Sequence, residues 1–95
     1  MAAYVFAQIE VTDPAPYEEY RKQVLAVVTQ YGGRFIVRGG KVDTKEGDWK
    51  PERMIALEFP TMEQAQKWYH SAEYAPLIAL RKKASKGKLI IVEGA

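Results

Sequence analysis

The sequence predicts an α+β protein with a ferredoxin-like βαββαβ order, and three observations carry this prediction. Four short segments rich in β-branched and aromatic residues alternate with segments whose apolar residues recur at helical spacing. Proline, glycine and polar residues separate these segments at the expected turns. Right-handed connections then arrange the strands as a four-stranded antiparallel sheet with the helices on one face. Residues 1–95 are expected to form one domain.

Local signals mark the ends of the predicted elements. Pro14 suits the first turn of a helix, and Gly32 suits the left-handed residue that ends one. Thr61 and Gln64 have the spacing of a capping box, and Gly87 is expected to end the last helix. In chain order, the predicted elements are a strand at 3–11, a helix at 14–31, strands at 34–39 and 53–59, helices at 62–70 and 73–85, and a strand at 88–93.

Both faces of the predicted sheet are apolar. A sheet with helices on one face should carry polar residues on the other if that face meets water. One alternating set is assigned to the helix side: Val5, Ala7, Ile9, Phe35, Val37, Ile55, Leu57, Phe59, Leu89 and Ile91. The opposite set is too apolar to stay uncovered, so we expect a homodimer whose two sheets pack face to face. The predicted interface residues are Phe6, Ile36, Met54, Ile90 and Val92.

The stretch YGGRFIVRGG (31–40) places two arginines on this open face. Arg34 and Arg38 have an even spacing, and Glu58 follows on the neighbouring predicted strand. The expected register brings Arg38 opposite or diagonal to Glu58. A kink or bulge is expected at the glycine pair 39–40. Arg34 is interpreted as a charge that blunts an edge strand, whereas for Arg38 a role at a site and simple edge protection both stay open.

The candidate site is built around this pair. Glu58 is the candidate general acid or base, and Arg38 the group that stabilises developing negative charge. The candidate ligand-binding residues are Gln8, Trp49, Tyr74 and Arg81. A non-catalytic alternative, in which Arg38 and Glu58 form a buried ion pair within a ligand-binding or structural dimer, stays open.

Composition limits the remaining function classes. The chain has no cysteine and one histidine, His70, so neither a thiolate nucleophile nor a metal cage is expected, and no cofactor is assigned. A tyrosinate-bound haem is the one exception left open. The net charge of +2, with both signs interspersed, gives no broad field for nucleic acid. The apolar runs are shorter than a membrane span and no signal peptide is recognised, so a cytoplasmic protein is expected.

Several ordered motifs resemble those of one family. The stretches YGGRFIVRGG, EGDWKPERMIALEFP, WYHSAEYAPLIALR and IVEG are similar to the domain-of-unknown-function 1330 family of the dimeric α/β-barrel superfamily. The resemblance implies a protomer that dimerises through its sheet. It assigns no reaction. Relatives elsewhere in the superfamily include cofactor-free monooxygenases, isomerases or cyclases of small aromatic or polyketide-like compounds, and haem-binding enzymes. Its recurrent positions correspond to Gly32, Gly33, Arg38, Gly39, Gly40, Arg53, Glu58, Tyr69, Ser71, Tyr74 and Arg81.

Overall fold

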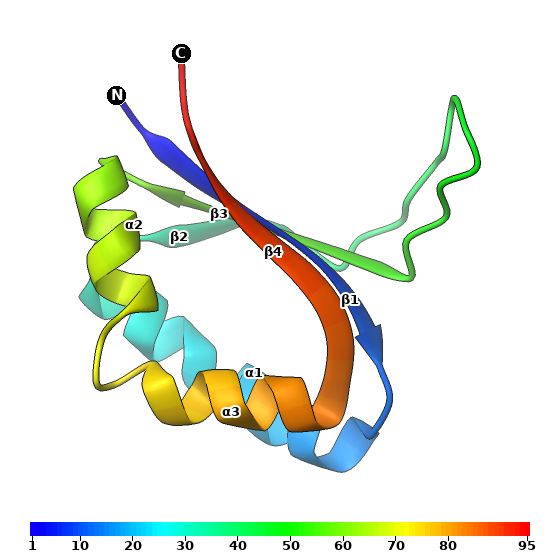
Figure 1. The fold of residues 1–95 in the computed structure, drawn as a ribbon, viewed down its shortest axis with the longest axis horizontal. Coiled ribbons are helices and arrows are strands. Elements are labelled where there is room, and N and C mark those ends of the chain that lie inside the picture. The colour runs from blue at the N-terminus through cyan, green and yellow to red at the C-terminus, as the bar shows by residue number, and fades with distance from the viewer.

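The computed structural model describes residues 1–95 and contains the predicted order of elements (Figure 1). The elements are β1 (Ala3–Val11), α1 (Pro14–Gln30), β2 (Arg34–Arg38), β3 (Arg53–Phe59), α2 (Met62–Tyr69), α3 (Ala75–Ala84) and β4 (Ser85–Glu93). The strands form one antiparallel sheet in the order β2-β3-β1-β4. All three helices lie on one side of this sheet, so the predicted ferredoxin-like α+β fold is confirmed.

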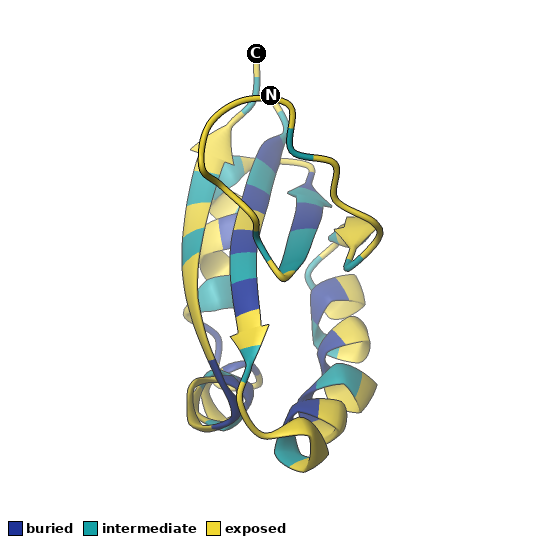
Figure 2. Ribbon diagram, turned by 90° about the vertical axis from the view of Figure 1, so that its right-hand side faces the viewer, coloured by how far each residue is buried: buried dark blue, intermediate teal, exposed yellow.

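The hydrophobic core fills the space between the sheet and the helices. Figure 2 shows that the strands alternate buried and less buried residues, and that α1 turns its buried side toward the sheet. This pattern follows from the two-residue repeat of a strand and the 3.6-residue repeat of a helix. The largest fully buried side chains are Trp68, Tyr74, Phe59, Val5 and Val28.

The ends of the helices follow most of the local signals. Gly32 has a φ of 83°, as expected for the residue that ends α1. The Gln64 backbone N–H donates to the Thr61 hydroxyl over 3.1 Å, which caps α2. The Gln64 side chain does not complete a capping box, because its Oε1 accepts from the Thr61 hydroxyl over 3.4 Å and not from the Thr61 backbone N–H. Its Nε2 donates to the carbonyl oxygen of Tyr31. This bond joins the end of α1 to the start of α2.

Gly87 does not end a helix, and this prediction was wrong. The helix α3 ends at Ala84, and β4 begins at Ser85 without an intervening loop. Gly87 pairs with Ile9 inside the sheet, where a β-carbon would collide with the carbonyl oxygen of Gln8. Glycine is therefore required by the close approach of the neighbouring strand.

A β-bulge in β2 changes which residues face the helices. Phe35 pairs with Leu57, but the next pair is Val37 with Ala56, so Ile36 is an extra residue. The bulge lies at Ile36 and not at the predicted glycines. It turns Val37 to the open face and Arg38 to the helix side, which reverses the predicted assignment of both residues.

The sheet face opposite the helices is uncovered and carries large apolar side chains. Ile90 keeps 57% of its surface exposed. Phe6, Ile36, Val37 and Val92 are also exposed, and Met54 is half-buried. None of the three helices has the length and apolar character needed to cross a membrane.

Candidate functional site

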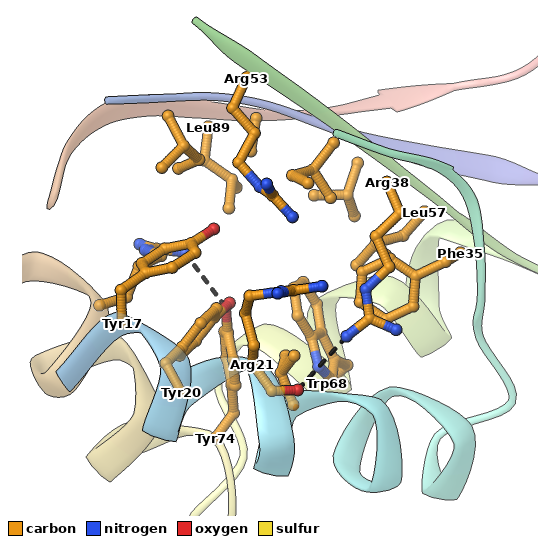
Figure 3. Close-up of a pocket in the computed structure, with 16 residues that line it drawn as sticks. Tyr17, Tyr20, Arg21, Phe35, Arg38, Arg53, Leu57, Trp68, Tyr74 and Leu89 are labelled. Carbon is orange, nitrogen blue, oxygen red and sulfur yellow. Dashed lines mark hydrogen bonds between the residues drawn. The ribbon is translucent and has the colours of Figure 1, made fainter. Parts of the chain in front are cut away.

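A narrow cleft lies between the sheet and α1 and α3 (Figure 3). Its apolar walls come from all four strands, from α1 and α2, and from Tyr74, which precedes α3. The lining residues without charge are Val5, Ala7, Ile9, Tyr17, Tyr20, Val24, Phe35, Ile55, Leu57, Trp68, Tyr74 and Leu89. The cleft is narrow, with a cavity volume of about 30 Å³. A ligand larger than a few waters can therefore enter only if side chains at the mouth move.

Four arginines line this apolar space: Arg21, Arg38, Arg53 and Arg81. Figure 3 shows the side chains of Arg21, Arg38 and Arg53 around it. No carboxylate and no histidine lines the cleft. Of the four, Arg21 alone has an ion-pair partner, Glu18, at 3.2 Å on the surface of α1. The cleft is therefore positively charged and lacks internal counter-charges.

Arg38 is placed in the cleft by the bulge in β2. Its guanidinium lies over the ring of Phe35, 4.2 Å from the ring centroid, and Nη2 donates to the carbonyl oxygen of Arg21 over 3.3 Å. These contacts hold the side chain between β2 and α1 without neutralising its charge. Arg38 thus offers its remaining donors to the mouth of the cleft.

Arg53 enters the cleft from β3 and packs against a glycine. Gly39 has a φ of 71°, and a β-carbon there would lie 2.6 Å from Cζ of Arg53. Glycine thus permits both the left-handed turn and the close approach of the guanidinium. The Nε atoms of Arg53 and Arg21 are buried without a hydrogen-bond partner. Unpaired buried donors of this kind are costly unless a ligand or water completes them.

Arg81 forms the inner end of the cleft together with two phenols. The Arg81 side chain is buried, and its Nη1 donates to the Tyr74 hydroxyl over 3.1 Å. The hydroxyl oxygens of Tyr74 and Tyr20 are 2.8 Å apart, and the Tyr74 ring stacks on Trp68. Burial raises the pKa of Tyr20 and, further still, that of Tyr74, so both phenols keep their protons at neutral pH.

The open face of the sheet holds a different and complete set of polar contacts. Arg34, and not Arg38, meets Glu58: Arg34 Nη2 lies 2.6 Å and Nε 2.7 Å from Glu58 Oε1. The Tyr4 hydroxyl donates to Glu58 Oε2 over 3.1 Å. The hydrogen bonds from Arg34 and then Tyr4 lower the pKa of Glu58, so this group is an ionised carboxylate and a poor general acid. The predicted pairing of Arg38 with Glu58 was wrong, because the bulge separates them onto opposite faces.

Comparison with known protein families assigns the chain to one family. The family described as "Domain of unknown function (DUF1330)" matches residues 2–95. The chain belongs to the DUF1330 family. A comparison with curated proteins found no match.

Solved structures share the fold of this DUF1330 protein at low sequence identity. RPA0582 from Rhodopseudomonas palustris, a protein of unknown function, is 14% identical with a TM-score of 0.73, covering 99% of this chain and 82% of that chain. SnoaB from Streptomyces nogalater, a cofactor-independent oxygenase, is 11% identical with a TM-score of 0.63, covering 99% and 92%. The de novo designed protein Foldit4 is 13% identical with a TM-score of 0.62, covering 100% of both chains. Because a designed protein fits about as well as an oxygenase, these similarities establish the fold alone.

The predicted site residues of the DUF1330 chain separate into two groups. Arg38, Tyr74 and Arg81 line the cleft, as described above. Glu58, Gln8 and Trp49 belong to the open side, where the Trp49 indole N–H donates to Gln8 Oε1 over 2.9 Å. Tyr74 and Arg81 thus share the cleft with Arg38, whereas Trp49 does not line it. The structure contains no cluster of three potential metal ligands.

Sequence reasoning missed four residues of the cleft that carry a polar group: Arg21, Arg53, Tyr17 and Tyr20. Helical spacing could have identified Arg21, because it lies four residues after the inward Tyr17 and three before the inward Val24. Arg53 is the first residue of β3, and strand alternation from Ile55 could have placed it on the helix side. Tyr20 fits the apolar stripe of α1, and nothing in the sequence distinguishes its hydroxyl from that of a packing tyrosine.

Proposed function

We propose that the cleft of this protein binds a small, mainly apolar organic anion. The observation that carries the proposal is the set of Arg38, Arg53 and Arg81, which line an aromatic cleft without a carboxylate partner. A cation partly removed from water is stabilised by a counter-charge, and guanidinium groups match the two oxygens of a carboxylate. The aromatic and aliphatic walls suit the apolar body of such a ligand.

The residues of the cleft suit binding of an anion better than formation of an anion by proton removal. A general base for proton removal at neutral pH would be a carboxylate or a histidine, and neither lines the cleft. The available proton-bearing groups are phenols, and those of Tyr20 and Tyr74 have raised pKa values. A substrate of this site therefore arrives already ionised, or loses its proton to water. The same chemistry would serve a binding protein or an enzyme that acts on a preformed anion.

We further propose that the protein is a homodimer joined through the open face. This face carries exposed Phe6, Ile90 and Val92 next to half-buried Met54, which a second sheet would remove from water. The Arg34–Glu58 pair lies at the same face and satisfies its own charge. The cleft opens on the other side of the sheet, so both copies would keep an accessible site.

Binding of a matched anion and neutral analogue tests the proposed ligand chemistry. Trp68 lines the cleft and Trp49 does not, so Trp49→Phe leaves one tryptophan, whose fluorescence reports on the site. In this background we expect benzoate to bind roughly tenfold or more tightly than benzamide, since a charge-assisted pair contributes about 1.5–3 kcal/mol.

Two arginine variants locate the binding to one face of the sheet. Arg53→Met and Arg38→Met each remove a cleft cation, and we expect each to weaken benzoate binding about tenfold. Arg34→Met removes an arginine from the opposite face and should leave the affinity unchanged. Equal affinity for benzoate and benzamide, or an equal loss in all three variants, would contradict an anion site in the cleft.

A further inference from the structure

A buried hydrogen-bond chain leads from Arg81 to the cleft through two phenols. Arg81 Nη1 lies 3.1 Å from the Tyr74 hydroxyl, which lies 2.8 Å from the Tyr20 hydroxyl. Both phenols line the cleft, but Tyr74 has no exposed surface, whereas Tyr20, on α1, retains 8% of its surface. In Figure 3 the two hydroxyl groups meet beside the cleft, below the guanidinium of Arg53.

The distance alone allows either phenol to be the donor, but the chemistry of the three groups favours one direction for this hydrogen-bond chain. A guanidinium can only donate, so the Tyr74 oxygen accepts from Arg81. The Tyr74 proton then needs an acceptor, and because Tyr74 is fully buried, the Tyr20 oxygen is the acceptor within reach. With its oxygen accepting from Tyr74, Tyr20 has a proton that no protein group accepts. Its position on the wall of the cleft makes the cleft the place where that proton can be donated.

We infer that Tyr20 donates its hydroxyl proton in a hydrogen bond to the oxyanion of the ligand, and that Arg81 and Tyr74 orient and polarise this donor. The inference rests on the proposed function, because it names the group that contacts the anion at the inner end of the cleft. Hydrogen bonds in such a chain strengthen one another, and each donor here is aligned by the one before it. Tyr20 is thus a binding residue, whereas Tyr74 is a positioning residue.

Carboxylate, enolate and phenolate ligands share the oxyanion that this donor requires. Benzoate is the probe for carboxylate ligands, and para-nitrophenol is the probe for phenolate ligands. The absorption of para-nitrophenol shows directly whether the bound molecule is protonated. Since tenfold tighter binding of the anion lowers the pKa of a bound acid by one unit, we expect the pKa of para-nitrophenol to fall when it binds.

Tyr20→Phe removes the donor and keeps the ring. We expect it to weaken binding of the para-nitrophenolate anion by roughly tenfold or more, and to raise the pKa of the bound phenol by about one unit. Binding of the neutral para-nitroanisole should change by about twofold at most. Tyr31→Phe is the matched control, because it removes a phenol at the C-terminal end of α1 that contacts Glu73 and does not line the cleft.

Tyr74→Phe tests the direction of the hydrogen-bond chain from Arg81 to Tyr20. It breaks the link to Arg81 and leaves the Tyr20 hydroxyl in place, so we expect a smaller loss of anion binding than in Tyr20→Phe. The double variant should bind the anion no more weakly than Tyr20→Phe alone, because Tyr74 acts through Tyr20. Losses that simply add, or a larger loss from Tyr74→Phe, would overturn the assignment of Tyr20 as the contacting donor. The fluorescence of Trp68 and thermal unfolding show that each variant is folded.

The two proposals can fail separately. If wild-type protein binds anionic and neutral probes equally, the proposed function itself fails. If wild-type protein prefers the anion and Arg53→Met removes this preference, but Tyr20→Phe leaves both the affinity and the pKa of the bound phenol unchanged, the function stands and the inference about Tyr20 is wrong. If benzoate binding depends on Tyr20 and para-nitrophenolate binding does not, the donor serves a carboxylate only.

Discussion

The two faces of the sheet use arginine in opposite ways. On the open face, Arg34 has Glu58 within 2.6 Å and Tyr4 completes the second oxygen of the same carboxylate. On the helix side, Arg38 and Arg53 enter an aromatic cleft and meet no carboxylate. The first set is neutralised within the chain, whereas the second has no counter-charge within the chain. A buried or half-buried arginine that has no carboxylate partner therefore indicates a ligand site better than an arginine that already forms an ion pair.

The largest expected effect concerns the open face. Ile90→Lys places a charge at the centre of the proposed dimer interface, and an unpaired buried charge costs several kcal/mol. We expect the dimer dissociation constant to rise roughly 100-fold or more, measured by analytical ultracentrifugation. Ile90→Val is the control and should remain dimeric. Wild-type protein that sediments as a monomer at micromolar concentration would show that this face has another role.

Giving the cleft an internal carboxylate should make it resemble the open face. Phe35 lies 4.2 Å from the guanidinium of Arg38, so Phe35→Glu supplies the counter-charge that the cleft lacks. We expect benzoate binding to weaken by roughly 100-fold, because attraction between charges near 4 Å is about 4 kcal/mol at an intermediate dielectric. The same titration of Phe35→Gln, which has the size without the charge, should show a much smaller loss. Similar losses in both variants would mean that Phe35 contributes its ring alone.

Removing the charge of Glu58 should alter stability and leave binding unchanged. Arg34 and Tyr4 hold the pKa of Glu58 below its value in the unfolded chain, so the native state binds this proton less readily. The stabilisation is fully present above the unfolded value, about 4.3, and is lost as pH falls through the lowered native value. Thermal unfolding should show wild-type protein more stable than Glu58→Gln at neutral pH, with the difference shrinking in acid.

Benzoate binding to the same Glu58→Gln variant sharpens the distinction between the faces. Glu58 does not line the cleft, so we expect an affinity equal to that of the wild type. A marked loss would restore Glu58 to the functional site in spite of its place on the open face.

The smallest effect is expected from Trp49→Phe. Trp49 is 56% exposed and its indole donates one hydrogen bond to Gln8. Loss of this bond should lower the free energy of unfolding by about 1 kcal/mol or less, measured by urea titration. Calorimetric titration with benzoate should give the wild-type affinity, because neither residue faces the cleft. A tenfold change would indicate that the loop reaches the site.

The sequence by itself determined the order of elements and the apolar character of both sheet faces. These properties are local, because a two-residue or 3.6-residue repeat fixes which side chains share a face within one element. Tyr74 and Arg81 were predicted from the family resemblance and not from periodicity, and both are buried in the structure. The apolar open face also followed from alternation alone, through Phe6, Ile90 and Val92.

The tertiary structure alone decided which arginine meets which partner. One extra residue, Ile36, turns Arg38 from the face of Glu58 into the cleft, and a bulge depends on how two strands pair and not on the composition of one. The link between Tyr20 and Arg81 likewise joins α1 to α3, which are distant in sequence. The repeats along the chain establish which residues share one face of a strand or helix. The contacts that make a site form between elements, and strand register and helix packing decide which residues meet there.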